Sequence, residues 1–316
     1  MTVLGRESDL EASAHRMGPV SGEGGDRIAL TSFIVGSALA GGNGVAVRFS
    51  NRELDPLWGA GFRFALAAAL GLTIMAVMRL AMPRGRALWG AVLYGALSFA
   101  GAFSLAYYAL LRLHAGFGQT LLALVPLATL LVAVAWRQER LRASGVVGSL
   151  VALAGVAVMS GASAQDVHLP SVLASVGAAL CFAQAAVLVR WIPHVHPVTM
   201  NAVGMAAGAV LLILGSLVAG ETIELPRLTA TWVSIAYVVP VGSIMVFFLY
   251  LVVLRYWHAS RAAYEFVLIP FVTVALSNWL DDEPLGLGLA LGGLLVLAGV
   301  YVGALRPAVE REPADV

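Results

Sequence analysis

The feature that most constrains the fold of this chain is a segment that it contains twice. Residues 114–158 align with residues 258–302 at a constant offset of 144 positions and without a gap. The identical pairs are His114/His258, Ala115/Ala259, Leu124/Leu268, Pro126/Pro270, Thr129/Thr273, Glu139/Glu283, Leu141/Leu285, Gly148/Gly292, Leu150/Leu294, Leu153/Leu297, Ala154/Ala298, Gly155/Gly299, Val156/Val300 and Val158/Val302. A shared hydrophobic composition does not explain the matching Pro, Glu, His and Gly residues. We therefore expect two copies of one structural unit.

The composition identifies the solvent in which these units fold. Hydrophobic residues make up 60% of the chain and charged residues 12%, whereas soluble domains have about 45–50% and about 25%. So much apolar surface requires a lipid bilayer as partner. Ten apolar segments of spanning length are predicted, at residues 28–48, 56–79, 86–111, 115–136, 144–161, 170–192, 197–220, 229–257, 260–280 and 286–305. The fold class is an all-α polytopic membrane protein.

Ten spans in two copies give five transmembrane helices in each copy. An odd number of spans makes the copies cross the membrane in opposite senses, which predicts an inverted repeat and, with it, alternating access. The predicted domains are a disordered cytoplasmic tail (1–27), the first five-helix repeat (28–161), an external linker (162–169), the second repeat (170–305) and a cytoplasmic C-terminal tail (306–316).

Arginine placement predicts the orientation of the chain. Most arginines fall on one side of the ten spans, together with both chain ends, whereas few flank the loops on the other side. Basic residues favour the cytoplasmic side of short loops. We therefore expect the protein to lie in the inner membrane with both termini in the cytoplasm.

Glu265 is the most conspicuous polar residue of the second repeat. It lies inside the ninth span, with Arg261 one turn earlier and Thr273 near the same face further along the helix. A carboxylate inside the membrane is costly unless it is paired, protonated or facing water. This indicates a proton or substrate-cation site. An ion pair with Arg261 that reaches the interface is the alternative.

The repeated prolines mark spans four and nine as neighbours of the transport pathway. Pro126 and Pro270 each remove a backbone donor within a predicted span, and Thr129 and Thr273 follow one turn later. Such breaks persist where protein or a water-filled cavity satisfies the freed groups. A proline kink that only shapes helix packing is the alternative.

Six further polar or aromatic residues are candidates for the cavity lining. Arg63 in span two could read a substrate carboxylate or snorkel to the outer headgroups. Tyr107, Tyr108 and Tyr250 could stack on a planar substrate, although packing or an interfacial belt explains aromatic residues equally. The amides of Asn43 and Gln184 could donate into a cavity or join helices.

Other features favour packing over chemistry. Glu139, among arginines, is expected to cap and orient span four. Glycines along spans five and ten favour close helix packing, within one half or in a homodimer. His194 and His196, with prolines beside them, fit a solvated turn better than a metal site, and Cys181 is the only cysteine. No cofactor, metal site or nucleic-acid motif is expected.

The ordered motifs resemble the EamA family of the drug/metabolite transporter superfamily. Each repeat has a proline-containing helix, a short acidic turn and a glycine-rich last helix, as in VPLATLLVAVAWRQERL before GSLVALAGVAV and IPFVTVALSNWLDDEPL before GGLLVLAGVYV. The resemblance covers residues 28–305 and implies a secondary transporter that exports amino acids, metabolites or drugs. Gln138 and Asp282 depart from the family turn, which usually has Gly before Glu. A membrane-embedded enzyme and a non-transporting accessory subunit are the alternatives.

Overall fold

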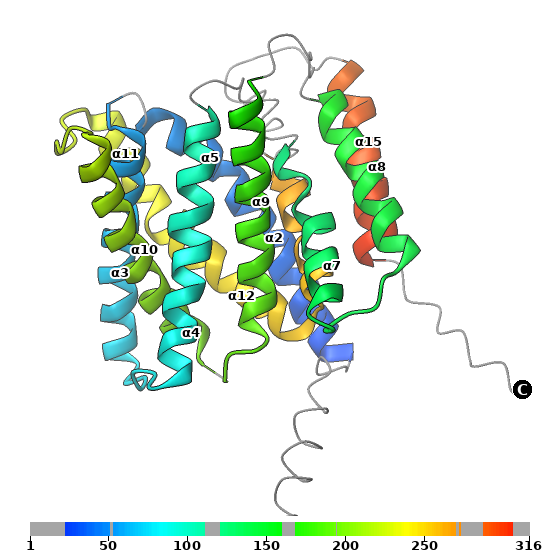
Figure 1. Ribbon diagram of the computed structural model, residues 1–316, viewed down its shortest axis with the longest axis horizontal. Helices are drawn as coiled ribbons and strands as arrows, with labels where there is room; N and C mark the ends of the chain where they lie inside the picture. Colours follow the sequence, from blue (N-terminus) through cyan, green and yellow to red (C-terminus); the bar gives the residue numbers. More distant parts are fainter. Residues whose placement is uncertain are drawn as a thin grey trace, which may run out of the picture.

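The computed structural model describes residues 23–50, 53–110, 121–159, 168–193, 195–269, 272 and 287–305, and every regular element in these ranges is a helix (Figure 1). The elements are α2 (Glu23–Ser50), α3 (Pro56–Val77), α4 (Arg86–Gly95), η1 (Ala96–Gly101), α5 (Ala102–Leu110), α7 (Val125–Ala135), α8 (Ala143–Met159), α9 (Leu169–Val189), α10 (Pro197–Ala219), α11 (Thr229–Val238), η2 (Pro240–Met245), α12 (Val246–Tyr256), α13 (Ala259–Ala262), α15 (Leu287–Val300) and η3 (Tyr301–Leu305). The predicted fold class is confirmed.

Most of the described helices follow the predicted spans because local chemistry sets their ends, but α2 begins at Glu23, inside the tail predicted to be disordered. Among the described residues, five helices are long and apolar enough to cross a membrane, and three further apolar helices are shorter. Proline lies in the first turn of α3, α9 and α10, where its missing N–H costs no hydrogen bond. Gly220 ends α10 in the left-handed conformation at φ 72°, as glycine commonly does.

Two π-helical segments reveal the repeat inside spans three and eight. The segments η1 and η2 interrupt otherwise α-helical spans, and they are offset by the same 144 positions as the repeated sequence. A π-helical turn inside an α-helix is uncommon and is found mostly at functional sites. The repeat therefore extends to a backbone irregularity that the sequence comparison did not include.

The two halves interleave in one bundle. The closest helix pairs join a span of the first half to a span of the second: α3 with α10, α8 with α15, α5 with α9 and α2 with α12. In Figure 1, α8 and α15 lie side by side at one edge of the bundle. A Cβ atom at Gly148 would come within 2.6 Å of the Gly303 backbone. These glycines therefore pack the two halves against each other within one chain.

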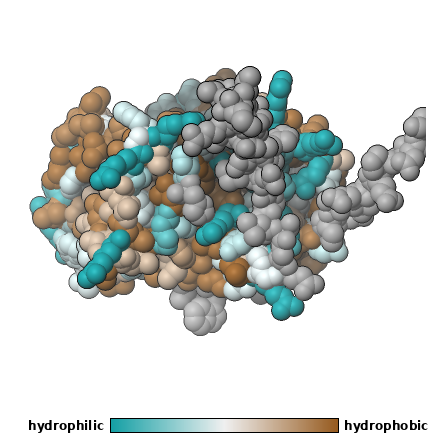
Figure 2. Space-filling view, turned by 90° about the horizontal axis from the view of Figure 1, so that it is seen from below, coloured by the Kyte–Doolittle hydropathy of each residue, from teal (hydrophilic) through white to brown (hydrophobic). Residues whose placement is uncertain are grey.

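One end of the bundle collects the arginines. We call it the arginine-rich end; it holds the start of α2, the ends of α7, α9 and α12 and the start of α4, at the bottom of Figure 1. Figure 2 views the molecule from this end and shows hydrophilic side chains spread among hydrophobic ones. The opposite end holds the turn before α3 and the loop between α10 and α11.

Candidate functional site

Glu265 belongs to the ninth span, just after α13, and lies buried against the first span. Only 2% of its surface is exposed. A Cβ atom at Gly36 of α2 would come within 2.7 Å of its Oε1, so only glycine leaves room for the carboxylate here. Oε2 is buried without a hydrogen-bond partner among the described residues. Such groups are rare in native proteins and call for a specific explanation, such as an ion, a proton or a ligand.

Tyr250 of α12 adds a second polar group of the same kind. It is buried, and no described residue forms a hydrogen bond with its hydroxyl. This hydroxyl lies within electrostatic range of the Glu265 carboxylate. Its ring meets that of Phe266 edge-on, with centroids 5.9 Å apart. Glu265 and Tyr250 were both predicted as candidates from the sequence, and the fold brings them near each other.

A run of aromatic rings leads from Tyr250 across the bundle. The rings come from α12, span nine, α9, α5 and α3, so both halves contribute. The successive centroid distances are 5.9 Å (Tyr250–Phe266), 4.8 Å (Phe266–Phe182), 5.9 Å (Phe182–Phe103) and 5.0 Å (Phe103–Phe64). Offset and edge-on ring contacts of this kind present apolar surface with a polarised edge. The interior beside Glu265 is therefore aromatic and largely apolar.

Arg63 stands at the far end of this run and is held by η2. It is buried, and its Nε donates to Ser243 Oγ at 2.8 Å while Nη2 donates to the Gly242 carbonyl at 3.0 Å. Its guanidinium also lies over the Phe64 ring, 5.1 Å from the centroid. A π-helical turn displaces carbonyls from the regular ladder, which gives Arg63 an acceptor inside the bundle. Arg63 therefore does not snorkel to the headgroups.

The two predicted amides differ in their surroundings. Asn43 Nδ2 donates to the Gly242 carbonyl at 3.1 Å, so this side chain joins α2 to η2, which was one of its two predicted roles. Gln184 on α9 buries its Oε1 without a partner among the described residues.

Span four differs from its predicted form. A turn at residues 123–124 precedes α7, so Pro126 lies in the first turn of a helix and not inside a continuous one. Its missing N–H therefore frees no carbonyl. Thr129 is buried and donates to the Val125 carbonyl of its own helix at 2.7 Å. Hydroxyl bonding to the preceding turn satisfies Thr129 without a cavity.

The remaining candidates lie at the surface or outside the described residues. Tyr108 is 49% exposed on α5, which fits the interfacial alternative better than a central lining. Tyr107 belongs to the same helix, but its side chain lies outside the described part of the structure, and so do Pro270 and Thr273.

The alternative assignment of Glu265, an ion pair with Arg261, is wrong. Arg261 Nη1 lies 3.5 Å from Asp26 Oδ1 at the start of α2. Its guanidinium covers the Trp257 ring, 3.8 Å from the centroid. The tight turn at 263–264 separates α13 from the helical residues that begin at Glu265, so the expected one-turn spacing of a continuous helix is lost. Arg261 therefore serves the arginine-rich end and leaves the carboxylate unpaired.

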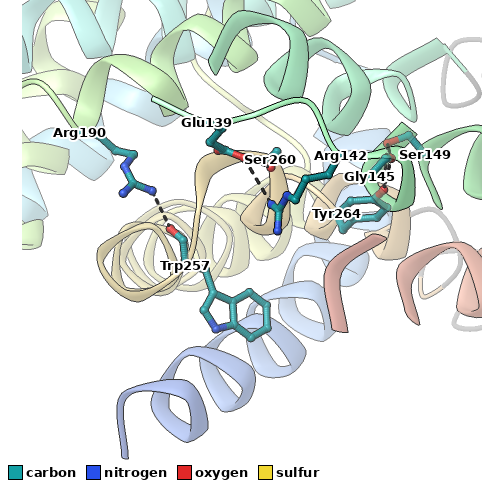
Figure 3. A network of polar contacts seen from close by, with 8 residues as sticks. All are labelled: Glu139, Arg142, Gly145, Ser149, Arg190, Trp257, Ser260 and Tyr264. Carbon is teal, nitrogen blue, oxygen red and sulfur yellow. Dashed lines mark hydrogen bonds and ion pairs between the residues drawn. The ribbon is translucent and has the colours of Figure 1, made fainter. Parts of the chain in front are cut away.

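Sequence reasoning missed the residues that hold span nine in place. Glu139 does not cap span four: its carboxylate accepts a hydrogen bond from the backbone N–H of Ser260 at 3.2 Å (Figure 3). Tyr264 donates its hydroxyl to the Gly145 carbonyl at 2.8 Å. The only sequence signal for these turns was the repeat itself, in which Glu139 matches Glu283 and His258 matches His114.

A surface groove at the arginine-rich end is separate from this site. It lies between the start of α4 and the ends of α7 and α9 and is lined by Arg86, Trp89, Gly90, Val92, Leu93, Ala96, Trp136, Leu188, Trp191, Ile192 and Pro193. None of the residues predicted to bind substrate lines it. Exposed tryptophans at a membrane interface form the aromatic belt that anchors a helix bundle.

A helical bundle of two interleaved halves with a few buried polar side chains is a fold found among polytopic membrane transporters with inverted repeats. A model described as the EamA-like transporter family matches residues 27–161 and 169–304. The chain therefore belongs to the EamA-like transporter family, and it is a multi-pass membrane transporter.

Curated relatives carry matching names. An uncharacterized transporter from Archaeoglobus fulgidus is 28% identical and covers 81% of this chain and 91% of its own length. The uncharacterized inner membrane transporter YedA from Escherichia coli is 27% identical over 83% of this chain and 88% of its own. A solved crystal structure superposes with a TM-score of 0.74 at 20% identity, covering 90% of this chain and 98% of that one; this likeness establishes the fold.

Proposed function

We propose that this transporter exports a small organic solute from the cytoplasm by alternating access, and that Glu265 is its proton- or cation-binding group. The observation that carries the proposal is the Glu265 carboxylate itself, which is buried against Gly36 with Oε2 unpartnered in the described structure. A charged or polar group in a membrane interior without a partner is a functional site by default. The arginine-rich end faces the cytoplasm in this proposal, with both termini on that side of the inner membrane.

The inverted architecture supports alternating access. We take the two halves as residues 28–161 and 170–305. Their contacts are symmetric: α5 of span three packs on α9 of span six, and α12 of span eight packs on α2 of span one. The matched π-helices η1 and η2 give spans three and eight an interruption at equivalent positions of the repeat. Helices bend readily at such interruptions of the hydrogen-bond ladder. The same sequence pattern can therefore build two packings, one open to each side.

The symmetry is broken at the site. The repeat counterpart of Glu265 is Leu121, which packs against an apolar cluster that includes Ala109 and Ala174. One half thus carries a carboxylate where the other carries a packing residue. The solute that best fits this site has an apolar or aromatic body and a protonated amine, because the aromatic rings supply apolar surface and the carboxylate a single negative charge.

Flux from proteoliposomes tests the proposal. Purified protein is reconstituted in vesicles loaded with a mixed pool of amino acids, amines and metabolites, with and without an imposed pH gradient, and the released solutes are identified by mass spectrometry. We expect gradient-stimulated release of selected solutes by the wild type, and loss of the stimulation in Glu265→Gln. Glu53→Gln, a change of an external carboxylate, is the matched control. Release that ignores both gradient and substitution would refute the role of Glu265.

A further inference from the structure

The start of span nine is held at the arginine-rich end by a buried carboxylate from the other half of the chain. Glu139, in the turn between α7 and α8, accepts hydrogen bonds from both the N–H and the hydroxyl of Ser260. Arg142 Nη2 lies 3.5 Å from Glu139 Oε2, and only 2% of the Glu139 side chain is exposed. We call Glu139, Arg142 and Ser260 the Glu139 latch. Because Glu139 follows α7, the latch ties the first half of the chain to the first turn of α13 (Figure 3).

Contacts on either side of the latch hold the same short stretch. The Tyr264 hydroxyl bonds to the Gly145 carbonyl at 2.8 Å and lies 2.9 Å from Ser149 Oγ on α8. At the other end of the stretch, Arg190, which follows α9, donates from its Nη1 to the Trp257 carbonyl at 3.3 Å. Figure 3 shows these groups in one polar network.

The first span completes the ring of contacts. Asp26 of α2 accepts from Trp257 Nε1 at 2.8 Å and lies 3.5 Å from Arg261 Nη1. Residues 257–264 are therefore held from α2, α8, α9 and the turn after α7. Glu265 is the next residue along the chain, so this stretch separates the buried carboxylate from the arginine-rich end.

The polar nature of these contacts distinguishes them from the packing of α8 on α15. At the α8–α15 pair, glycines bring backbones so close that a Cβ at Gly155 would lie 2.7 Å from the Gly292 carbonyl. Helices packed in this way are held together by van der Waals contacts along their length. Hydrogen bonds and ion pairs at a membrane surface can instead be exchanged for hydrogen bonds to water at small net cost. The network at residues 257–264 is thus a part of the interface at the arginine-rich end that can open without separating closely packed helices.

We infer that the Glu139 latch is the gate on the arginine-rich side: it closes the path to Glu265 and opens once in each transport cycle. The inference rests on the alternating access proposed above and assigns a role to residues outside the binding site. Glu139 is a positioning residue that acts through Ser260 on span nine. Weakening the latch opens the site toward the arginine-rich end, and fixing it stops transport.

A reversible cross-link tests the gate. Glu139→Cys and Ser260→Cys are combined in a Cys181→Ser background and joined by a short bifunctional thiol reagent that a reductant cleaves. We expect solute release from proteoliposomes to stop on cross-linking and to return on reduction. Asp55→Cys with Thr222→Cys is the matched control, since this hydrogen-bonded pair at the opposite end joins the loop before α11 to closely packed α3. Its cross-link is expected to leave transport unchanged.

The native cysteine supplies a second readout that needs no substrate. Cys181 lies in an apolar cluster with Phe266, the residue after Glu265. A membrane-impermeant maleimide is added to inside-out or right-side-out vesicles of Cys181-containing protein. We expect Glu139→Ala to raise the labelling rate several-fold from the arginine-rich side only, with a smaller rise for Ser260→Ala, which keeps the backbone donor.

Two outcomes overturn the gate: full transport by the cross-linked Glu139/Ser260 pair, or unchanged Cys181 labelling in Glu139→Ala. A block by the cross-link together with normal gradient dependence in Glu265→Gln would uphold the gate and reject the proposed role of Glu265. The two proposals therefore fail separately.

Discussion

Replacing Glu265 by leucine should stabilise the protein while abolishing its proposed activity. The carboxylate is buried with Oε2 unpartnered in the described structure, and a buried polar group without a partner costs about 1–3 kcal/mol. Leucine is shorter than glutamate and has no polar atom, so it fits beside Gly36, where the absence of a Cβ atom leaves room for the present carboxylate. The repeat counterpart Leu121 shows that this fold accepts leucine at the equivalent position.

The expected gain for Glu265→Leu is therefore about 1–3 kcal/mol in the free energy of unfolding. Using the scaling for domains of 150–250 residues, this raises Tm by roughly 2–12 °C. Thermal unfolding of purified protein in detergent measures the shift, and the flux assay measures the loss of activity. Glu265→Gln is the control, because its amide keeps a buried polar group and should bring no gain. A lower Tm for Glu265→Leu would show that the carboxylate has a structural partner, and normal flux would show that it has no role in transport.

Two further predictions follow from the contacts. A Cβ at Gly303 would overlap the Tyr264 hydroxyl, so Gly303→Ala should destabilise the protein by about 1–3 kcal/mol; Gly24→Ala, which meets nothing within 4 Å, should leave the unfolding midpoint nearly unchanged. At the opposite end, hydrogen bonds from the N–H and hydroxyl of Thr222 lower the pKa of Asp55 below its ordinary value of 3.8. Its contribution to stability is therefore complete above that value and is lost as the pH falls through the lowered pKa. Hydrogen exchange of the loop at 220–228 should rise in this acid range, and Asp55→Asn should remove the dependence; an unchanged pH profile in this variant would contradict the assignment.

Local chemistry made the helices predictable. The predicted span 56–79 is observed as Pro56–Val77, and 197–220 as Pro197–Ala219. Apolar length, a first-turn proline and a terminal glycine are all readable within a few residues of each helix end. The inverted repeat was readable for a related reason, since it is a property of the linear sequence.

Contacts between distant residues were not predictable in the same way. Arg63 was expected to face substrate or headgroups, but its acceptor Ser243 is 180 positions away and is presented by a π-helical turn that no local signal marks. Glu139 was expected to cap its own span, whereas Ser260 lies 121 positions away. Glu265 was found because a carboxylate in an apolar span is conspicuous by itself. Its unpaired state depends on Asp26, which draws Arg261 away.

The most direct test of the account records solute release and internal pH together in the same proteoliposomes. A pH-sensitive dye inside the vesicles reports proton movement, while sampling of the external medium reports the solute identified in the flux assay. We expect release of solute to be accompanied by an opposite movement of protons, and Glu265→Gln to abolish this proton movement. Solute release by the wild type with no change of internal pH, or an unchanged proton signal in Glu265→Gln, would contradict it.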